Sequence, residues 1–126
     1  MMREYKVEVE REDRWWMVHI PEIDGLTQAR RVDEIEDMAR SYIAVDTDTP
    51  LSDVSVHVVS IRIPKLGDVA GETAFVKNAR AVARKAEQDA VETTAACARR
   101  LTGAGIPVRD VAALLNVSPQ RVSQIA

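Results

Sequence analysis

Residues 4–10 alternate between hydrophobic and polar side chains, which is the pattern of a β-strand with one buried face. The polar residues 11–14 predict a turn, and the apolar run 15–20 predicts a second strand that forms a hairpin with the first. Pro21 cannot donate a hydrogen bond to a sheet, so we expect the second strand to end there. The chain is therefore expected to begin with a β-hairpin.

A third strand, a helix and a fourth strand are expected after the hairpin. Residues 24–25 are Asp-Gly, a pair typical of turns, and residues 26–30 are expected to form a short strand. Asp33 suits the N-cap of a helix whose apolar residues recur at helical spacing as far as about Asp46. The β-branched run 53–63 predicts another strand. This order predicts a small β-β-β-α-β domain of the α+β class.

A long helix is expected in the second half of the chain. The stretch from Gly71 to Thr102 is rich in alanine and free of proline, which favours a helix of roughly 45 Å that ends at Gly103 and Gly105. Residues on one side recur at spacings of three, four or seven, which is typical of a close seam between two helices. The alternative is that this helix folds back on its own N-terminal domain. The candidates for a homodimer interface are Phe75, Ala79, Val82, Ala86, Ala90 and Cys97.

Residues 107–126 predict two short helices joined by a tight turn. Pro107 suits the start of the first helix, and Asn116 suits the left-handed backbone that such a turn requires. Ser118 is a good N-cap for the second helix, and Pro119 is a good first residue. The pattern is typical of a helix-turn-helix. The alternative is a two-helix cap that never touches DNA.

A helix-turn-helix inserts the N-terminal end of its second helix into the major groove of double-stranded DNA. Glutamine can bind adenine through two hydrogen bonds, and arginine can bind guanine or a phosphate. The second helix is short and offers few contacts, so we expect a dimer on paired half-sites. The expected contacts with operator DNA are Arg109, Ser118, Gln120, Arg121, Ser123 and Gln124, with Arg99 and Arg100 adding attraction to phosphates.

Charge separates the two halves of the chain, whose net charge is −3. Residues 1–63 carry 8 Lys and Arg against 14 Asp and Glu, a net charge of −6, whereas residues 64–126 carry 9 against 6, a net charge of +3. An acidic front half repels phosphates and suits a basic protein partner, and a basic rear half suits DNA.

No residue pattern predicts catalysis, a metal site or a cofactor. His19 and His57 lie on expected strands without an assignable nucleophile, and no cluster has the spacing of metal ligands. A nuclease would need carboxylates gathered around a metal, and here they are spread over solvent-facing positions. No apolar run approaches the ~20 residues that span a bilayer, and no signal-peptide core precedes the first strand. With Cys97 as the only cysteine, a cytoplasmic protein is expected.

The order of motifs in the N-terminal half resembles the N-terminal domain of HicB-family antitoxins. The C-terminal helix-turn-helix is similar to the DNA-binding tail that many members of that family carry. The family often has glycine after its threonine-glutamine pair, where this chain has Ala29. The matching motifs are Trp15-Trp16 on the second strand, the Pro-x-Ile-x-Gly stretch 21–25, Thr27-Gln28 on the third strand, and the acidic helix from Asp33 to Ala44.

The resemblance implies a partial double-stranded-RNA-binding or RNase-H-like unit over residues 1–63, a linker and dimerisation helix over 64–102, and a DNA-binding module over 103–126. It further implies an antitoxin that covers a small, basic, mRNA-cleaving toxin of the HicA type and represses its own operon. The alternative is a stand-alone dimeric transcriptional regulator with no toxin partner. The candidates for contact with the toxin are Trp15, Glu8, Glu10, Glu22, Asp24, Glu34 and Asp37.

Overall fold

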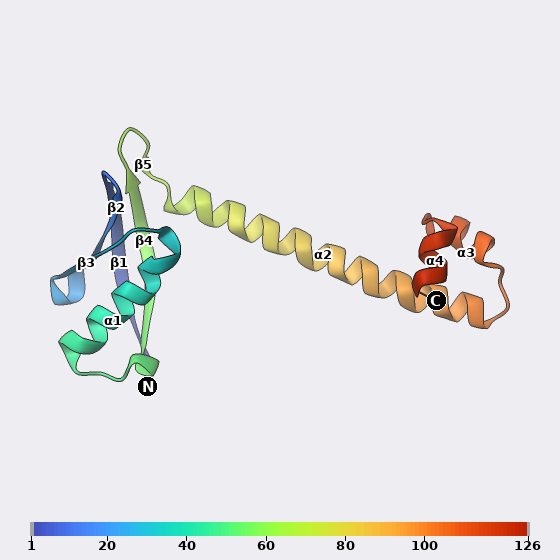
Figure 1. Cartoon of the computed structure of the whole chain (residues 1–126), viewed down its shortest axis with the longest axis horizontal. Coiled ribbons are helices and arrows are strands. Elements are labelled where there is room, and N and C mark those ends of the chain that lie inside the picture. The colour runs from blue at the N-terminus through green and yellow to red at the C-terminus, as the bar shows by residue number, and fades with distance from the viewer. Residues whose placement is uncertain (1, 126) are drawn as a thin grey trace. The chain divides into compact units, whose positions relative to one another are not determined.

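The computed structural model describes residues 2–125 and divides into an N-terminal unit, Met1–Val76, and a C-terminal unit, Lys77–Ala126. Figure 1 labels the elements of both units. The boundary between the units falls inside the long helix α2 (Ala70–Gly103). Each unit has a buried hydrophobic core of its own, so each can be understood separately.

The N-terminal unit begins with the antiparallel strands β1 (Arg3–Glu12), β2 (Trp15–Ile20) and β3 (Gly25–Ala29). Helix α1 (Ile35–Thr47) follows, and β4 (Val54–Ile63) then runs parallel to β1. The sheet order is β3-β2-β1-β4-β5. The predicted β-β-β-α-β order is confirmed, with each element ending within two residues of its expected bounds. Short 3-10 helices η1, η2 and η3 occupy Pro21–Ile23, Val32–Glu34 and Leu51–Asp53.

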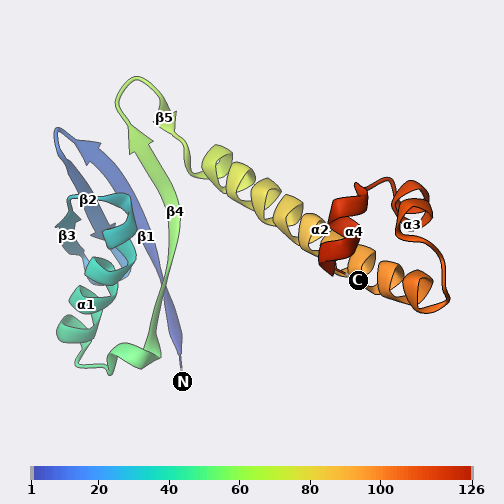
Figure 2. The ribbon, with the colours of Figure 1, turned by 45° about the vertical axis from the view of Figure 1, so that its right-hand side comes forward.

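Helix α1 covers one face of the sheet, as Figure 2 shows, and the core of this unit lies between them. Successive side chains of a strand point to opposite faces, so alternate residues of β1 enter the core. The even-numbered residues of β1, from Glu4 to Glu12, are exposed on the opposite side of the sheet, which we call the open face. The buried core consists of Tyr5, Val7, Val9, Val18, Ile20, Ala29, Ile35, Ala39, Ile43 and Val54.

The start of α1 differs from the sequence-based expectation. Asp33 is not its N-cap, because this residue lies in η2 and its carboxylate pairs with Arg31 at 2.7 Å. The N-cap of α1 is Glu34, which makes no side-chain capping hydrogen bond to that helix. The Glu34 Oε1 instead accepts a hydrogen bond from the backbone N–H of Arg31 at 3.1 Å, at the start of η2. The acidic start of the helix was predicted correctly, and its N-cap residue was not.

The stretch 64–71, which was expected to be only a boundary, contains the two-residue strand β5 (Gly67–Asp68). The Asp68 Oδ1 accepts hydrogen bonds from the backbone N–H groups of Ile61 at 2.9 Å and Ala70 at 3.0 Å. These bonds favour the charged carboxylate and lower the pKa of Asp68. A single exposed side chain thus joins the end of the sheet to the start of α2.

The outer edge of β4 is mostly unpaired. β5 pairs only with Arg62 and Ile63. Within residues 2–125, no strand lies beside the outer edge of β4 from Ser55 to Ser60.

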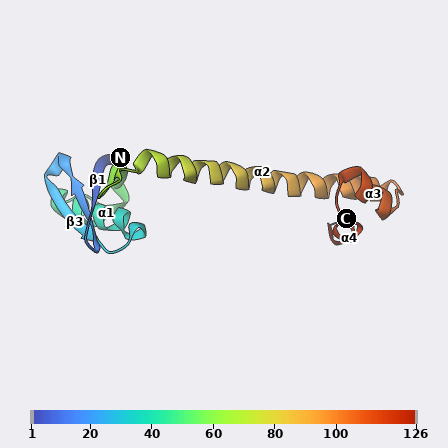
Figure 3. The same cartoon turned by 90° about the horizontal axis from the view of Figure 1, so that it is seen from above.

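The C-terminal unit is formed by the rest of α2, by α3 (Val108–Leu115) and by α4 (Pro119–Ile125). Helices α3 and α4 lie against the C-terminal end of α2 (Figure 3), and their shared core contains Ala98, Val111, Ala112 and Val122. The long helix predicted from Gly71 to Thr102 is confirmed to within one residue at each end.

The middle of α2 is exposed on all sides, since every residue from 71 to 93 is exposed. Among the helices of residues 2–125, none combines the length and the apolar character that crossing a membrane requires.

Candidate functional site

The turn between α3 and α4 has the backbone that the sequence predicted. Asn116 adopts the left-handed conformation, with φ 56° and ψ 45°, and its N–H bonds to the carbonyl of Ala112. The N–H of Val117 also donates to that carbonyl, at 3.0 Å. Both bonds satisfy the carbonyl end of α3 and turn the chain sharply toward α4.

Helix α4 begins as predicted, with Ser118 as its N-cap and Pro119 as its first residue. The Ser118 Oγ accepts a hydrogen bond from the backbone N–H of Arg121 at 3.0 Å. Pro107, expected as the first residue of α3, is instead the residue before it, because α3 begins at Val108. The Pro107 carbonyl accepts the first hydrogen bonds of that helix.

One side of α4 is buried and the other is polar. Val122 is 0% exposed and packs with Val111 of α3 and Ala98 of α2. The side chains on the opposite, exposed side of α4 carry hydrogen-bonding groups and no negative charge. The exposed DNA-contact candidates on α4 and its N-cap are Ser118, Gln120, Arg121, Ser123 and Gln124.

Two further arginines have different surroundings. Arg109, the sixth DNA-contact candidate, is exposed on α3. Arg99 is held at the end of α4, because its Nη1 donates to the carbonyl of Ile125 at 3.3 Å. Arg99 was expected to attract phosphates, and its support of α4 was not predicted. Residues 77–126 carry 8 Lys and Arg against 4 Asp and Glu, a net charge of +4.

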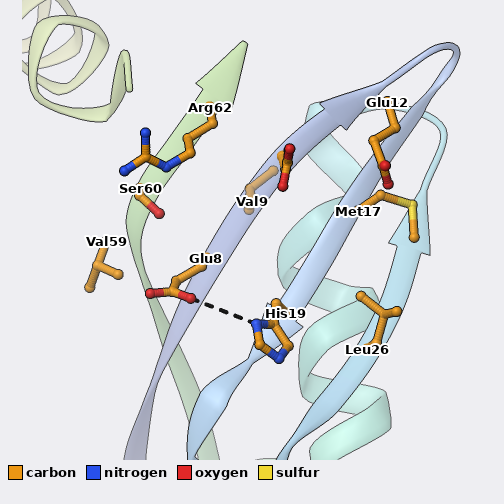
Figure 4. A pocket seen from close by; sticks show the side chains of 10 residues that line it. Glu8, Val9, Glu12, Met17, His19, Leu26, Val59, Ser60 and Arg62 are labelled. Carbon is orange, nitrogen blue, oxygen red and sulfur yellow. Dashed lines mark ion pairs between the residues drawn. The ribbon is translucent and has the colours of Figure 1, made fainter. Parts of the chain in front are cut away.

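The open face of the N-terminal sheet holds a groove of about 480 Å³ (Figure 4). Strand register explains its composition, because Glu8 lies opposite His19 and Glu10 lies opposite Met17 on the same face. Carboxylates of β1 therefore stand beside apolar side chains of neighbouring strands. The lining residues are Glu8, Val9, Glu10, Glu12, Met17, His19, Leu26, Val59, Ser60 and Arg62.

His19 lies between two carboxylates at one end of this groove. Its Nδ1 is 3.7 Å from the Glu8 Oε1, a contact marked by the dashed line in Figure 4, and its Nε2 is 4.0 Å from the Asp24 Oδ1. Both contacts become ion pairs when the imidazole is protonated. The groove thus joins excess negative charge to an apolar floor, a combination that suits a cationic side chain with an apolar stem.

The two adjacent tryptophans of β2 face opposite sides of the sheet, as strand alternation requires. Trp16 packs against the core, and the guanidinium of Arg11 lies 4.8 Å from its ring centroid. Both rings are half-buried, and the guanidinium of Arg30 lies 5.3 Å from the ring centroid of Trp15. Trp15 therefore differs from Trp16 in lying on the side of the sheet that α1 leaves uncovered.

The candidates for toxin contact do not form one surface. Glu8 and Glu10 line the groove on the open face, whereas Glu34 and Asp37 lie at the start of α1, which covers the other face. Glu22 pairs with Arg3 at 3.0 Å. The structure therefore brings only some of these candidates together.

Of the ten residues that line the groove, only Glu8 and Glu10 were predicted from the sequence to belong to a site, and Glu12, Met17, Leu26 and Val59 illustrate why the others were not. Glu12 continues the alternation of β1 and could have been found from it. Met17 and Leu26 could be found only from the pairing of three strands. Val59 lies at the register shift between β1 and β4, and no sequence pattern predicts that shift.

The candidates for a dimer seam lie along α2. Phe75, Ala79, Val82, Ala86 and Ala90 are exposed, and Cys97 is half-buried.

In the described part of the chain, no group of three or more His, Cys, Asp or Glu side chains is arranged to hold a metal ion.

The sequence matches no protein-family model, and neither a curated protein nor a solved structure shows significant similarity to it.

Proposed function

We propose that this chain binds double-stranded DNA through a helix-turn-helix formed by α3 and α4. One observation carries the proposal: α4 buries Val122 and leaves Gln120, Arg121 and Gln124 exposed beside a left-handed turn at Asn116. A two-helix cap needs only a polar outer side, which acidic residues supply equally well, whereas the outer side of α4 carries an arginine, two glutamines and no acidic residue. A helix that reads base edges needs those side chains.

In the proposed complex, α4 enters the major groove by its N-terminal end, and Gln120 and Arg121 contact base edges. Arg109 binds a phosphate and fixes the orientation of the module. The net charge of +4 on residues 77–126 supplies attraction that is independent of sequence. Because a single short helix makes few contacts, the binding species is a dimer on two half-sites.

The test is a fluorescence-anisotropy titration with the duplex that lies immediately upstream of the gene for this chain. Arg121→Ala is expected to weaken binding about tenfold to a hundredfold, since a bidentate arginine–guanine pair is worth roughly 1–3 kcal/mol. Arg14→Ala removes the same charge from the N-terminal unit and is the matched control. Equal affinities for both variants and the wild type would overturn the proposal.

We further propose that the N-terminal unit is an antitoxin module that covers a small basic toxin, as the resemblance to HicB antitoxins implies. Three features support this assignment. Residues 1–76 carry 9 Lys and Arg against 16 Asp and Glu, a net charge of −7. The groove on the open face offers Glu8, Glu10 and Glu12 beside an apolar floor. The β-β-β-α-β order is the order that the resemblance requires.

This second assignment is tested with the protein encoded by the reading frame adjacent to the gene for this chain. Both proteins are co-expressed, and the complex is quantified by pull-down and calorimetry. The Glu8→Gln, Glu10→Gln double variant is expected to weaken binding, because it removes two charges from the open face. Asp37→Asn removes a charge from α1 and serves as the control. A stronger effect of Asp37→Asn would move the interface to α1, and no complex at all would favour the stand-alone regulator.

A further inference from the structure

The exposed middle of α2 contains apolar side chains that a folded protein normally covers. Phe75 is 75% exposed and Val82 is 62% exposed, within the fully exposed run 71–93. Helices in proteins take most of their stability from packing one apolar side, and isolated helices are marginal in water. A helical stretch of this length is therefore expected to have a covering surface.

We propose that a second copy of this chain covers α2, with the two helices antiparallel and related by a two-fold axis at Ala86. Such an axis makes the interface self-complementary, because residue 86 + n of one chain faces residue 86 − n of the other. The inference gives a geometry to the dimer of the proposed function. Three independent features of α2 support it.

The first feature is the spacing of the seam. Starting at Ala86, the seam positions follow in steps of four, three and four residues in both directions, so the pattern is the same read either way. Val82 then faces Ala90 of the second copy, and Phe75 faces Cys97, which sets a larger side chain against a smaller one. The seam positions are Phe75, Ala79, Val82, Ala86, Ala90, Thr93 and Cys97.

The second feature is a separation of charge on either side of Ala86. Residues 77–85 contain four basic residues and no acid, and residues 87–92 contain three acids and no basic residue. An antiparallel pair centred at Ala86 sets the basic block of each helix opposite the acidic block of the other. A parallel pair in register sets like charges together, and such charges beside a seam decide the orientation of paired helices.

The third feature is the position of α3 and α4 on the same helix. Ala98 and Leu101, which pack against α3 and α4, lie about 120° and 60° around the helix from Ala86 at 100° per residue, so the covered side is about a quarter turn from the seam. The two-fold axis at the seam therefore places the α3 and α4 helices of both chains on the same face of the helix pair.

The same axis sets the separation of the two helix-turn-helix modules. Ala98 is 12 residues from Ala86. At 1.5 Å per residue, the two Ala98 positions are about 36 Å apart along the helices, close to one turn of B-DNA. A pairing inferred from spacing and charge thus matches the separation that two half-sites require.

Cysteine cross-linking in a Cys97→Ser background tests the pairing. The V82C/A90C double variant is expected to form a covalent dimer on oxidation, because the two positions face each other across a seam of small residues. V82C alone and A90C alone are expected to remain uncross-linked, and A86C, at the axis, serves as the positive control. Single variants that cross-link as fully as the double variant would establish a parallel pair and overturn the proposal.

Analytical ultracentrifugation supplies the second readout. The wild-type chain is expected to sediment at twice its mass of 14.0 kDa, and a purely monomeric species would overturn the proposal. Asp89 and the Lys85 of the second copy flank the seam on the same side, about 60° and 100° around the helix from Ala86. Asp89→Lys should raise the dissociation constant about tenfold, since the lost pair counts twice in a symmetric dimer. Adding Lys85→Glu should restore it. No DNA is present in these assays, so their failure leaves the DNA-binding proposal standing.

Discussion

The backbone of Gly25 lies close to the ring of Tyr42, and this contact allows a prediction about stability. The effect of Gly25→Ala on stability should change sign when the Tyr42 ring is removed. A Cβ atom built on Gly25 would lie 2.5 Å from the Tyr42 Cε1 and 3.1 Å from its Cδ1. Non-bonded carbon atoms prefer about 3.5–4.0 Å, so the ring must move. Overpacking of this kind costs about 1–3 kcal/mol. We expect Gly25→Ala to lower the free energy of unfolding of the N-terminal unit by about 2 kcal/mol.

Removing the ring should reverse this effect. The φ of Gly25 lies outside the left-handed region, so alanine is free to adopt the native backbone. Alanine also restricts the unfolded chain, which stabilises a protein by about 0.4–1 kcal/mol. In a Tyr42→Ala background the remaining close atom is the Ile23 Cγ1 at 3.3 Å, which a small side-chain shift relieves, so Gly25→Ala should be neutral or slightly stabilising. The two backgrounds should differ by about 2–3 kcal/mol, which is a measurable coupling between contacting residues.

Urea unfolding followed by tryptophan fluorescence is the assay. Both tryptophans of the chain lie in β2, so their emission reports on the N-terminal unit. Gly71→Ala is the matched control, since nothing lies within 4 Å of a Cβ atom built there. The reasoning is refuted if Gly25→Ala costs the same with and without the Tyr42 ring, because the cost would then come from the backbone and not from the contact.

Three further predictions concern other contacts. Arg40→Ala should cost about 1.5–3 kcal/mol in the same urea assay, because its Nε and Nη2 donate to the carbonyls of Val54 at 2.9 Å and Leu51 at 2.8 Å; an unchanged midpoint would contradict this. Val122→Ala should cost about 2 kcal/mol for two buried methyl groups and the cavity they leave; circular dichroism should show this loss while tryptophan fluorescence does not, and a shifted fluorescence transition would contradict the separate cores. The lowered pKa of Asp68 means that its carboxylate stabilises the fold above its unfolded pKa of about 3.9, and that this contribution is lost as pH falls through the lower folded value. Asp68→Asn lacks this carboxylate at every pH, so the stabilities of wild type and variant should differ at neutral pH and converge below about pH 4. A constant difference at all pH values would contradict the assignment.

Periodicity along the chain was sufficient to predict the elements of both units. Strict alternation in β1 identified its buried face, and Asn116 and Ser118 identified the turn and the start of α4. These predictions succeeded because each depends on contacts within a few residues of sequence. The exposed polar side of α4 follows from the same periodicity, since Val122 determines which side is inward.

The features that the sequence did not predict depend on choices between competing contacts or on distant segments. Asp33 suits a helix start, but the nearby guanidinium of Arg31 binds its carboxylate within η2, and the N-cap of α1 falls one residue later, on Glu34. A two-residue strand such as β5 has no periodicity to detect. The groove requires the register of β1 against β2 and β4, which only the folded sheet defines.

The unpaired outer edge of β4 has a consequence for handling the protein. The run from Val54 to Ile61 has high β-propensity and contains no Asp, Glu, Lys or Arg, the charges by which edge strands usually prevent pairing between molecules. Backbone amides on this edge should exchange with deuterium faster than those of β1, which has a strand on each side. On warming, this edge is the first place where chains would add to one another, so a lysine at Val59 should delay aggregation without altering the core.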